Sequence, residues 1–321
     1  MNLYPLKFQP ILKSIIWGGN DISKFKNLES IEDGIGESWE ISAVEDSISV
    51  VKNGELEGKP LDELINEAKG QFVGEKIYAK FGNKFPLLIK FIDAQDDLSI
   101  QVHPNDEYAK TIGEEYGKTE CWLVLEAKPK SDIIVGHNLN HRQDFEKYLL
   151  EKDIISHLRV LPIKKNDFFL IPAGTVHAIR KNTMIYEVQQ NSDTTYRVYD
   201  YDRKDNQGNT RELHVKRALD VINFPDKVNP SLPKVITKEN SILYKYTEND
   251  YFSVYRFDVD GKEIIDLKDE FSIIGLVDGQ LSINDMSFEN GEHAIVTNET
   301  KQLSVVGKGS LILTWPNETT L

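Results

Sequence analysis

The stretch that most constrains the fold runs from residue 98 to residue 122, LSIQVHPNDEYAKTIGEEYGKTECW. It opens with apolar and polar residues in strict alternation, which predicts a strand with one face in a core. After a loop, Glu120 stands at the start of a second predicted strand. The Glu120 carboxylate would then lie near the polar face of the first strand, which includes the imidazole of His103. This arrangement is typical of metal sites in β proteins, so we expect a second imidazole elsewhere in the chain. The residues of that polar face are Ser99, Gln101 and His103.

Strand-like runs recur along most of the remaining chain and predict a mainly β protein. Helical spacing appears only in short segments, at about 60–80 and 142–157, and in a few residues after His214. The segment 223–234 is rich in Pro and Asn and is the best candidate for a linker. From residue 235 onward short strands follow one another closely, a pattern typical of a sandwich or barrel. We therefore predict two domains, 1–230 and 235–321, the first with two helical inserts.

Composition narrows the class of partner. The chain has 321 residues and a formal net charge of −14, without a basic stretch that would bind nucleic acid. No apolar run is long enough to span a membrane, and the N-terminal residues lack the apolar core of a signal peptide. The single cysteine, Cys121, excludes an intrachain disulfide and is interpreted as a core residue rather than a nucleophile. A cytoplasmic protein with a small-molecule substrate is expected.

The further imidazole is His177, in the sequence Pro-Ala-Gly-Thr-Val-His that begins at residue 172. A Pro-x-Gly turn reverses the chain, so the following strand would bring His177 back over the sheet. This element resembles the second motif of cupins, whose jelly rolls bind metal inside a β-barrel. The first cupin motif usually contains His-x-His, whereas this chain has Gln101-x-His103. Two imidazoles, the Glu120 carboxylate and an amide oxygen suit a divalent metal such as Zn²⁺.

Other titratable residues give weaker signals. Three histidines near the second helical insert are interpreted as solvated, and His293 is interpreted as structural because no ligand partners stand near it in sequence. Lys90, inside a predicted buried strand, permits two interpretations: an amine that reaches solvent, or an ammonium directed into a cleft. Arg180 and Arg203 could bind phosphate or simply pair with exposed acids. The three histidines are His137, His141 and His157.

Several separated elements together resemble type I mannose-6-phosphate isomerases, the phosphomannose isomerases of the cupin superfamily. The elements are LKSIIWGG, GESWEIS, KFPLLIKFIDA, LSIQVHPND, GKTECW, PAGTVHAI and SDTTYRVYDYDR, in that order. The resemblance covers the whole chain and is closest to the short bacterial form, which lacks a large helical domain. It implies cupin-type jelly rolls, a catalytic one in 1–230 and a second without metal in 235–321.

The resemblance also implies an activity and a set of site residues. The activity is the interconversion of mannose 6-phosphate and fructose 6-phosphate, with one zinc ion per chain. The implied zinc ligands are Gln101, His103, Glu120 and His177. The implied catalytic residues are Arg197, Lys118 and Glu187, and the residues expected near the sugar or its phosphate are Lys90, Ser99 and Asp193.

An aldose–ketose isomerase must move a proton between adjacent carbons through an enediolate. Lys118 and Glu187 are both candidates for the base, and Arg197 would hold either the enediolate or the phosphate. Because a short turn separates the strands of Glu187 and Arg197, we expect both side chains on one wall of the barrel, facing the metal. Three alternatives remain: a cupin Fe(II) oxygenase, a non-catalytic sugar-phosphate binding protein, and an isomerase of another phosphosugar.

Overall fold

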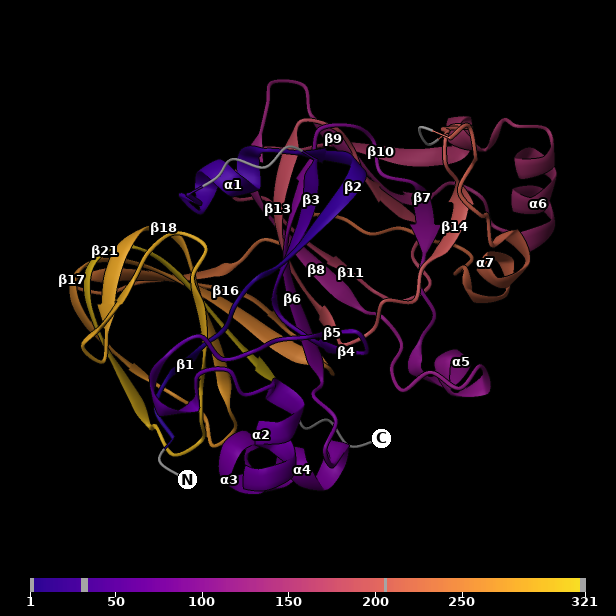
Figure 1. The fold of residues 1–321 in the computed structure, drawn as a ribbon. Helices are drawn as coiled ribbons and strands as arrows, with labels where there is room; N and C mark the ends of the chain where they lie inside the picture. The colour runs from indigo at the N-terminus through magenta and orange to yellow at the C-terminus, as the bar shows by residue number, and fades with distance from the viewer. Residues whose placement is uncertain (1–2, 30–33, 205–206, 318–321) are drawn as a thin grey trace.

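The computed structural model describes residues 3–29, 34–204 and 207–317. Most of this chain is β-strand, and Figure 1 shows two groups of strands side by side. One group carries the short helices α6 and α7 at its outer edge, and the other is the rolled set of C-terminal strands. The mainly β jelly-roll architecture predicted from the sequence is confirmed.

The first group consists of two antiparallel sheets. The six-stranded sheet has the order β11 (Phe168–Ile171), β8 (Glu120–Ala127), β13 (Thr183–Gln190), β6 (Leu87–Ala94), β3 (Ile35–Ile41) and β2 (Ile11–Gly19). The five-stranded sheet has the order β10 (Leu158–Pro162), β9 (Asp132–His137), β12 (His177–Ile179), β7 (Ile100–Val102) and β14 (Tyr196–Tyr199). A two-stranded hairpin is formed by β4 (Ala43–Val44) and β5 (Ser47–Ile48).

The two sheets pack face to face around an apolar core. Trp122 and Phe169 of the six-stranded sheet lie in one buried cluster with Val135 and Ile179 of the five-stranded sheet. Because side chains alternate along a strand, Cys121 points the other way, into the cluster behind the six-stranded sheet. Its thiol is buried and burial raises its pKa, which confirms the interpretation as a core residue.

Short helices cover the outer face of the five-stranded sheet. The helix α6 (Arg142–Leu150), the 3₁₀ turn η2 (Ile154–His157) and α7 (Val215–Val221) confirm the predicted helical segments there. The sequence prediction missed α5 (Asp106–Thr111), which it treated as loop. The signal was present at its first turn, since the Asn105 side chain accepts a hydrogen bond of 2.9 Å from the Tyr108 amide as an N-cap.

His137 corrects a second prediction, because it is fully buried rather than solvated. Its Nε2 lies 3.1 Å from the carbonyl oxygen of Asn223, and its ring packs against Phe145 and Phe224. A histidine at the end of a strand is buried when a helix and a returning segment cover it, and neither contact is visible in the local pattern.

The C-terminal third forms one sheet that rolls around its own core. Its order is β1 (Leu6–Lys7), β20 (His293–Val296), β18 (Ser272–Ile283), β21 (Gln302–Pro316), β17 (Phe252–Asp266), β16 (Ser241–Glu248) and β15 (Lys234–Thr237), with β19 (Met286–Phe288) paired to β18. The strand β1 belongs to this sheet although it comes first in the chain, with Leu6 opposite Ile295. The N-terminal residues therefore join the two groups of strands.

A large apolar cluster connects the back of the six-stranded sheet to this C-terminal unit. It includes Phe91 and Tyr186 from the sheet and Ile273 and Ile295 from the C-terminal strands. The helices α2 (Leu61–Ala68), α3 (Gly70–Val73) and α4 (Glu75–Phe81) confirm the first predicted helical segment. They contribute apolar side chains to this cluster and lie below the strands in Figure 1. The remaining short elements are α1 (Asp21–Phe25) and the 3₁₀ turn η1 (Gly54–Leu56).

A buried ion pair lies inside this contact between the two units. Lys26 Nζ is 2.8 Å from a Glu40 carboxylate oxygen, and the Lys26 and Glu40 side chains are 6% and 3% exposed. His293 Nδ1 lies 3.4 Å from the same carboxylate, and its Nε2 lies 3.2 Å from the Tyr186 hydroxyl. These contacts give His293 the structural role that its isolation in the sequence suggested.

Removing Lys26 should destabilise the protein strongly. The change Lys26→Met leaves the Glu40 carboxylate buried without its cation, and such uncompensated charges cost about 3–5 kcal/mol in the free energy of unfolding. Lys24→Met is the control, since the Lys24 side chain is 54% exposed and its ammonium contacts the side chains of Asp21 and Asn20 at the surface. Denaturant unfolding followed by tryptophan fluorescence measures both; equal midpoints for the two variants would refute the structural role of the pair.

Among the described residues, no helix is long and apolar enough to cross a membrane.

Candidate active site

Three buried side chains, at the ends of three different strands, converge between the two sheets. Glu120 and His177 are the first residues of β8 and β12, and His103 directly follows β7. Their ligand atoms all lie within 4.8 Å of one another. His103 Nε2 is 3.4 Å from one Glu120 oxygen, and His177 Nε2 is 3.4 Å from the other. The structure thus brings together the three central residues that the sequence singled out.

The backbone orients both imidazole rings toward the carboxylate. His103 Nδ1 lies 2.9 Å from the carbonyl oxygen of Thr194, and His177 Nδ1 lies 2.9 Å from that of Thr175. A carbonyl oxygen only accepts, so each Nδ1 carries the proton and donates it. Each Nε2 therefore presents a lone pair to the space beside Glu120, as in metal-binding histidines held by an outer partner.

Electrostatics keep these residues in the protonation states that a metal requires. Burial lowers the pKa of His103 to about 3, with the Lys118 charge acting in the same direction, and burial also lowers the pKa of His177. Burial alone would raise the pKa of Glu120, but His103, Lys118 and His177 outweigh it and hold the pKa well below its usual range. At neutral pH the set is two neutral imidazoles and one carboxylate, and metals bind these forms.

Two atoms of this cluster are buried without any hydrogen-bond partner in the part of the chain that the structure describes: His103 Nε2 and Glu120 Oε2. Buried polar atoms are rarely left unpaired, and both are ligand atoms directed at one point. The Gln101 amide lies beside them, 3.4 Å from His177 Nε2, and rotation of the amide would present its oxygen. The donor set therefore fits a divalent metal ion.

A tight turn delivers His177 to this point. Gly174 has φ +86, in the left-handed region, and its amide donates a 2.9 Å hydrogen bond to the carbonyl oxygen of His103. The Pro-x-Gly motif thus connects the two imidazole-bearing segments directly. The turn also moves the chain from β11 in one sheet to β12 in the other.

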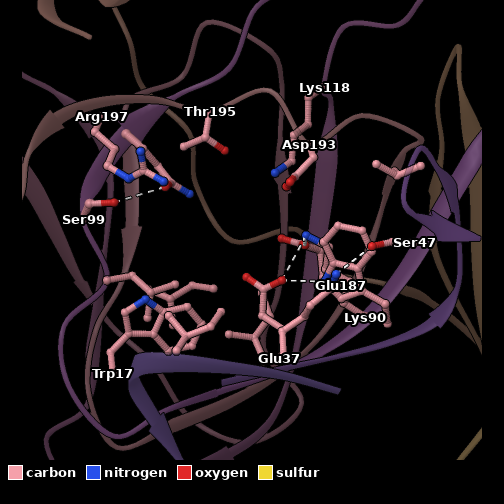
Figure 2. A pocket seen from close by; sticks show the side chains of 18 of the residues that line it. Trp17, Glu37, Ser47, Lys90, Ser99, Lys118, Glu187, Asp193, Thr195 and Arg197 are labelled. Carbon is pink, nitrogen blue, oxygen red and sulfur yellow. Dashed lines mark hydrogen bonds and ion pairs between the residues drawn. The ribbon is translucent and has the colours of Figure 1, made fainter. Parts of the chain in front are cut away.

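A polar cavity of about 530 Å³ opens beside the cluster. Its volume lies within the range of small-molecule sites, and both sheets contribute to its walls. Seven sequence-predicted residues line it: Lys90, Ser99, Gln101, Lys118, Glu187, Asp193 and Arg197. Figure 2 shows Ser99 and Arg197 on one side of the cavity and Lys90, Glu187 and Glu37 on the other. Arg180 and Arg203 lie elsewhere and pair with aspartates.

The Lys90 ammonium is directed into the cavity rather than to solvent, because its side chain is buried and lines the cavity. This is the second of the two interpretations that the sequence permitted. Its Nζ lies 3.4 Å from Glu37 and 3.7 Å from Glu187. Each carboxylate also accepts an indole N–H, Glu187 from Trp122 at 2.9 Å and Glu37 from Trp39 at 2.6 Å. Two similar carboxylate–indole pairs thus flank one ammonium group.

The two carboxylates nevertheless differ in acidity. Burial and the nearby Glu120 charge raise the pKa of Glu187 to about 7, against the opposing effect of Lys90 and Lys118. Burial acts on Glu37 as well, but Lys90 and the Trp39 hydrogen bond outweigh it and lower its pKa. Of the two carboxylates, Glu187 therefore has the pKa suited to proton exchange near neutral pH.

Arg197 lies on a different wall from the one predicted. Glu187 belongs to β13 in the six-stranded sheet, whereas Arg197 belongs to β14 in the five-stranded sheet. The turn between them crosses from one sheet to the other instead of forming a hairpin, so the prediction of a common wall is wrong. Arg197 pairs in register with Gln101, which in turn pairs with His177. The guanidinium therefore faces Glu187 across the cavity, beside the cluster of His103, Glu120 and His177.

Sequence reasoning missed Glu37, Trp39 and Lys13, all of which line the cavity. The alternation in GESWEIS carried part of the signal, since Glu37 and Trp39 stand two residues apart and share a face. The neighbouring strands that place this face in the cavity were not visible locally.

Comparison with known proteins identifies the family. Residues 5–151 match "Phosphomannose isomerase type I, catalytic domain", and residues 243–316 match "Mannose-6-phosphate isomerase, cupin domain". A mannose-6-phosphate isomerase of Streptococcus mutans is 37% identical over 320 residues, covering 98% of this chain and 99% of the relative. A probable mannose-6-phosphate isomerase of Bacillus subtilis is 36% identical over 320 residues with the same coverage. The crystal structure of the mannose 6-phosphate isomerase from Bacillus subtilis superposes with a TM-score of 0.88 at 34% identity, covering 97% of this chain and 99% of that one. The chain belongs to the type I phosphomannose isomerase family.

Proposed function

We propose that this enzyme interconverts mannose 6-phosphate and fructose 6-phosphate through an enediolate, with one zinc ion per chain. The observation that carries the proposal is the pair of unpartnered, buried ligand atoms on His103 and Glu120 at a polar cavity of substrate size. Family membership supplies the substrate class, since the relatives are named as isomerases of this sugar phosphate.

His103, Glu120 and His177 would hold the metal, with Gln101 as a fourth ligand. Two imidazoles and one carboxylate with room for further ligands are the pattern of catalytic zinc sites. When bound, zinc supplies Lewis acidity that polarises the carbonyl and hydroxyl oxygens of the substrate. Lys118 Nζ, 3.7 Å from Glu120 Oε2, adds positive charge next to the ligand carboxylate.

Glu187 is the proposed base. Its Oε1 accepts the Trp122 N–H, which leaves Oε2 to take a proton from one of the two reacting carbons and return it to the other. Lys90 holds this carboxylate in place from 3.7 Å. Ser99, across the cavity from Glu187, and the exposed Asp193 are proposed to contact sugar hydroxyls.

Arg197 is proposed to stabilise the enediolate. A guanidinium stays protonated at neutral pH, so this residue must hold an anion rather than act as a base. Its position opposite Gln101 puts it next to the residues that would hold the metal, where the enediolate charge would develop.

Replacing Arg197 should mainly slow the chemical step. Arg197→Ala is expected to lower kcat by about 10²–10³-fold with KM nearly unchanged, as for removal of an oxyanion donor. Arg180→Ala is the control, since that guanidinium pairs with Asp132 at 2.7 Å and lies outside the cavity. Steady-state kinetics decide the role: a raised KM with kcat kept would make Arg197 a phosphate ligand instead.

We also propose that the two domains have different roles. Residues 1–230 form the catalytic domain and residues 235–321 a cupin-like domain that binds no metal, with β1 attaching the N-terminus to the latter. Metal found at His293, which pairs with Glu40, would contradict this.

A coupled assay, in which auxiliary enzymes consume the product fructose 6-phosphate and thereby change the absorbance, tests the proposed activity. Turnover with mannose 6-phosphate, zinc content near one per chain and no oxygen consumption are expected. Oxygen consumption with bound iron would favour the cupin oxygenase, and binding without turnover would favour a sugar-phosphate binding protein. Comparison with other aldose phosphates fixes the sugar specificity.

A further inference from the structure

Five cations line the cavity, and most of them are neutralised by carboxylates. Lys90 pairs with two glutamates, Lys118 lies 3.7 Å from Glu120, and Arg211 forms two hydrogen bonds with Asp200. In the described part of the chain, the two remaining cations have no carboxylate oxygen within ion-pair distance. These two are Arg197 and Lys13.

The substrate carries negative charge at its two ends. The enediolate forms at C1 and C2, and the phosphate sits on C6 at the far end of the sugar. Arg197 stands beside the metal cluster and suits the enediolate. Lys13 lies on β2. Three strands, β13, β6 and β3, separate β2 from β8, which begins with Glu120. At about 4.8 Å per strand, β2 and β8 are roughly 19 Å apart across the sheet.

Lys13 reaches back over this sheet toward the cavity. Its ammonium lies 4.6 Å from the centre of the Trp39 ring, which also carries the Lys90 ammonium at 4.6 Å. Lys13 Nζ donates a 2.6 Å hydrogen bond to Ser47 Oγ on the β4–β5 hairpin. Figure 2 shows Ser47 across the cavity from Ser99 and Arg197. The Lys13 ammonium therefore lies at the end of the cavity away from Arg197.

We propose that Lys13 and Ser47 form the phosphate subsite and thereby set the specificity for phosphorylated sugars. This assignment rests on the proposed isomerase function. An ammonium group binds phosphate as a compact point charge, and two of its three N–H donors remain after the bond to Ser47. The Ser47 hydroxyl accepts from Lys13 and keeps its own O–H to donate to a phosphate oxygen. The aromatic face of Trp39 holds the ammonium in place.

Lys90 is a poorer candidate for the phosphate, although it lies nearby. Two carboxylates already satisfy its charge, and a phosphate there would meet the negative charges of Glu37 and Glu187. Two acidic residues line the Lys13 end. Glu45 is exposed and forms no ion pair with Lys13 among the described residues, and Glu37, opposite Lys13 in register, is already engaged by Lys90 at 3.4 Å and by the Trp39 N–H at 2.6 Å.

The test compares Lys13→Met with Lys13→Arg and with Lys245→Met. Methionine keeps the length of the side chain and removes its charge, and arginine restores the charge. Lys245 is a matched control, since its ammonium also lies 4.6 Å from an aromatic ring, that of Tyr255, but outside the cavity. Steady-state kinetics with mannose 6-phosphate, competitive inhibition by inorganic phosphate and zinc content are measured for each.

For Lys13→Met we expect KM and the inhibition constant of phosphate to rise roughly 10- to 100-fold, with kcat within a few-fold and zinc retained. Lys13→Arg should recover most of the loss, and Lys245→Met should behave like the wild type. Unchanged KM and unchanged phosphate inhibition in Lys13→Met would overturn the proposal. If that variant does not fold, Ser47→Ala decides: phosphate inhibition several-fold weaker supports the subsite, and wild-type inhibition overturns it.

Failure of the isomerase function would show separately, as absence of turnover in the wild type. In that case calorimetric titration with mannose 6-phosphate still tests the subsite. Weaker binding to Lys13→Met than to Lys245→Met supports it, and equal binding overturns it.

Discussion

Replacing His177 with alanine should remove the metal and abolish activity. Of the proposed ligands, His103, Glu120 and Gln101 then remain, and the lost one is an imidazole that the Thr175 carbonyl oxygen orients at 2.9 Å. Because the bound zinc would supply the Lewis acidity of the proposed reaction, we expect kcat to fall on the order of 10³-fold or more. Metal analysis of the dialysed protein and the coupled assay measure the two losses together.

The matched control is His141→Ala. His141 is exposed and immediately precedes α6, where its side chain makes no capping hydrogen bond. This variant should keep its zinc and its activity. A His177→Ala protein that is folded, free of metal and fully active would refute the role of the cluster in catalysis.

Glu187→Gln should have the next largest effect. Glutamine has the same shape and keeps an oxygen to accept the Trp122 N–H, but it cannot carry the proton between the two carbons. General acid–base catalysis contributes typically about 10²–10⁴-fold, so we expect kcat to fall roughly 10³-fold with little change in KM. Solvent-proton exchange at C2 of the substrate should slow by the same factor.

The pH dependence separates Glu187 from its neighbour. The base must be deprotonated, so kcat/KM should rise with pH as Glu187 loses its proton. Burial, Glu120 and Glu37 raise this pKa, and Lys90 and Lys118 lower it. A cation bound at Glu120 would offset part of the Glu120 effect. The acidic limb should therefore lie between the ordinary 4.5 and about 7.

Glu37→Gln provides the comparison, since Glu37 also accepts an indole N–H and contacts Lys90. It should leave kcat within about tenfold and keep an acidic limb, because its low pKa excludes it from proton transfer. A Glu187→Gln enzyme with nearly wild-type kcat would instead assign the base to Lys118.

The convergence of His103, Glu120 and His177 could be predicted from the sequence because local rules determine it. Alternation along a strand places Gln101 and His103 on one face, and the Pro-x-Gly turn returns His177 to the same space. The resemblance to a known family then implied that these residues form one set of metal ligands. The structure adds the two carbonyl contacts that orient the rings, which depend on loops far away in sequence.

Features that depend on which sheet a strand joins could not be predicted. The sequence between Glu187 and Arg197 is compatible with a hairpin turn and with a connection between two sheets. In the structure it connects the six-stranded sheet to the five-stranded sheet. Lys90 remained ambiguous for the same reason, since its neighbours Glu37 and Glu187 come from strands far apart in the chain. Burial of His137 likewise depends on the returning segment that contains Phe224.

Zinc reconstitution tests the central claim most directly. The protein is stripped with a chelator, dialysed and titrated with zinc while turnover of mannose 6-phosphate is followed in the coupled assay. Isomerase activity should be absent in the stripped protein and should rise linearly to a plateau at one zinc ion per chain. Full activity in the metal-free protein would contradict the account.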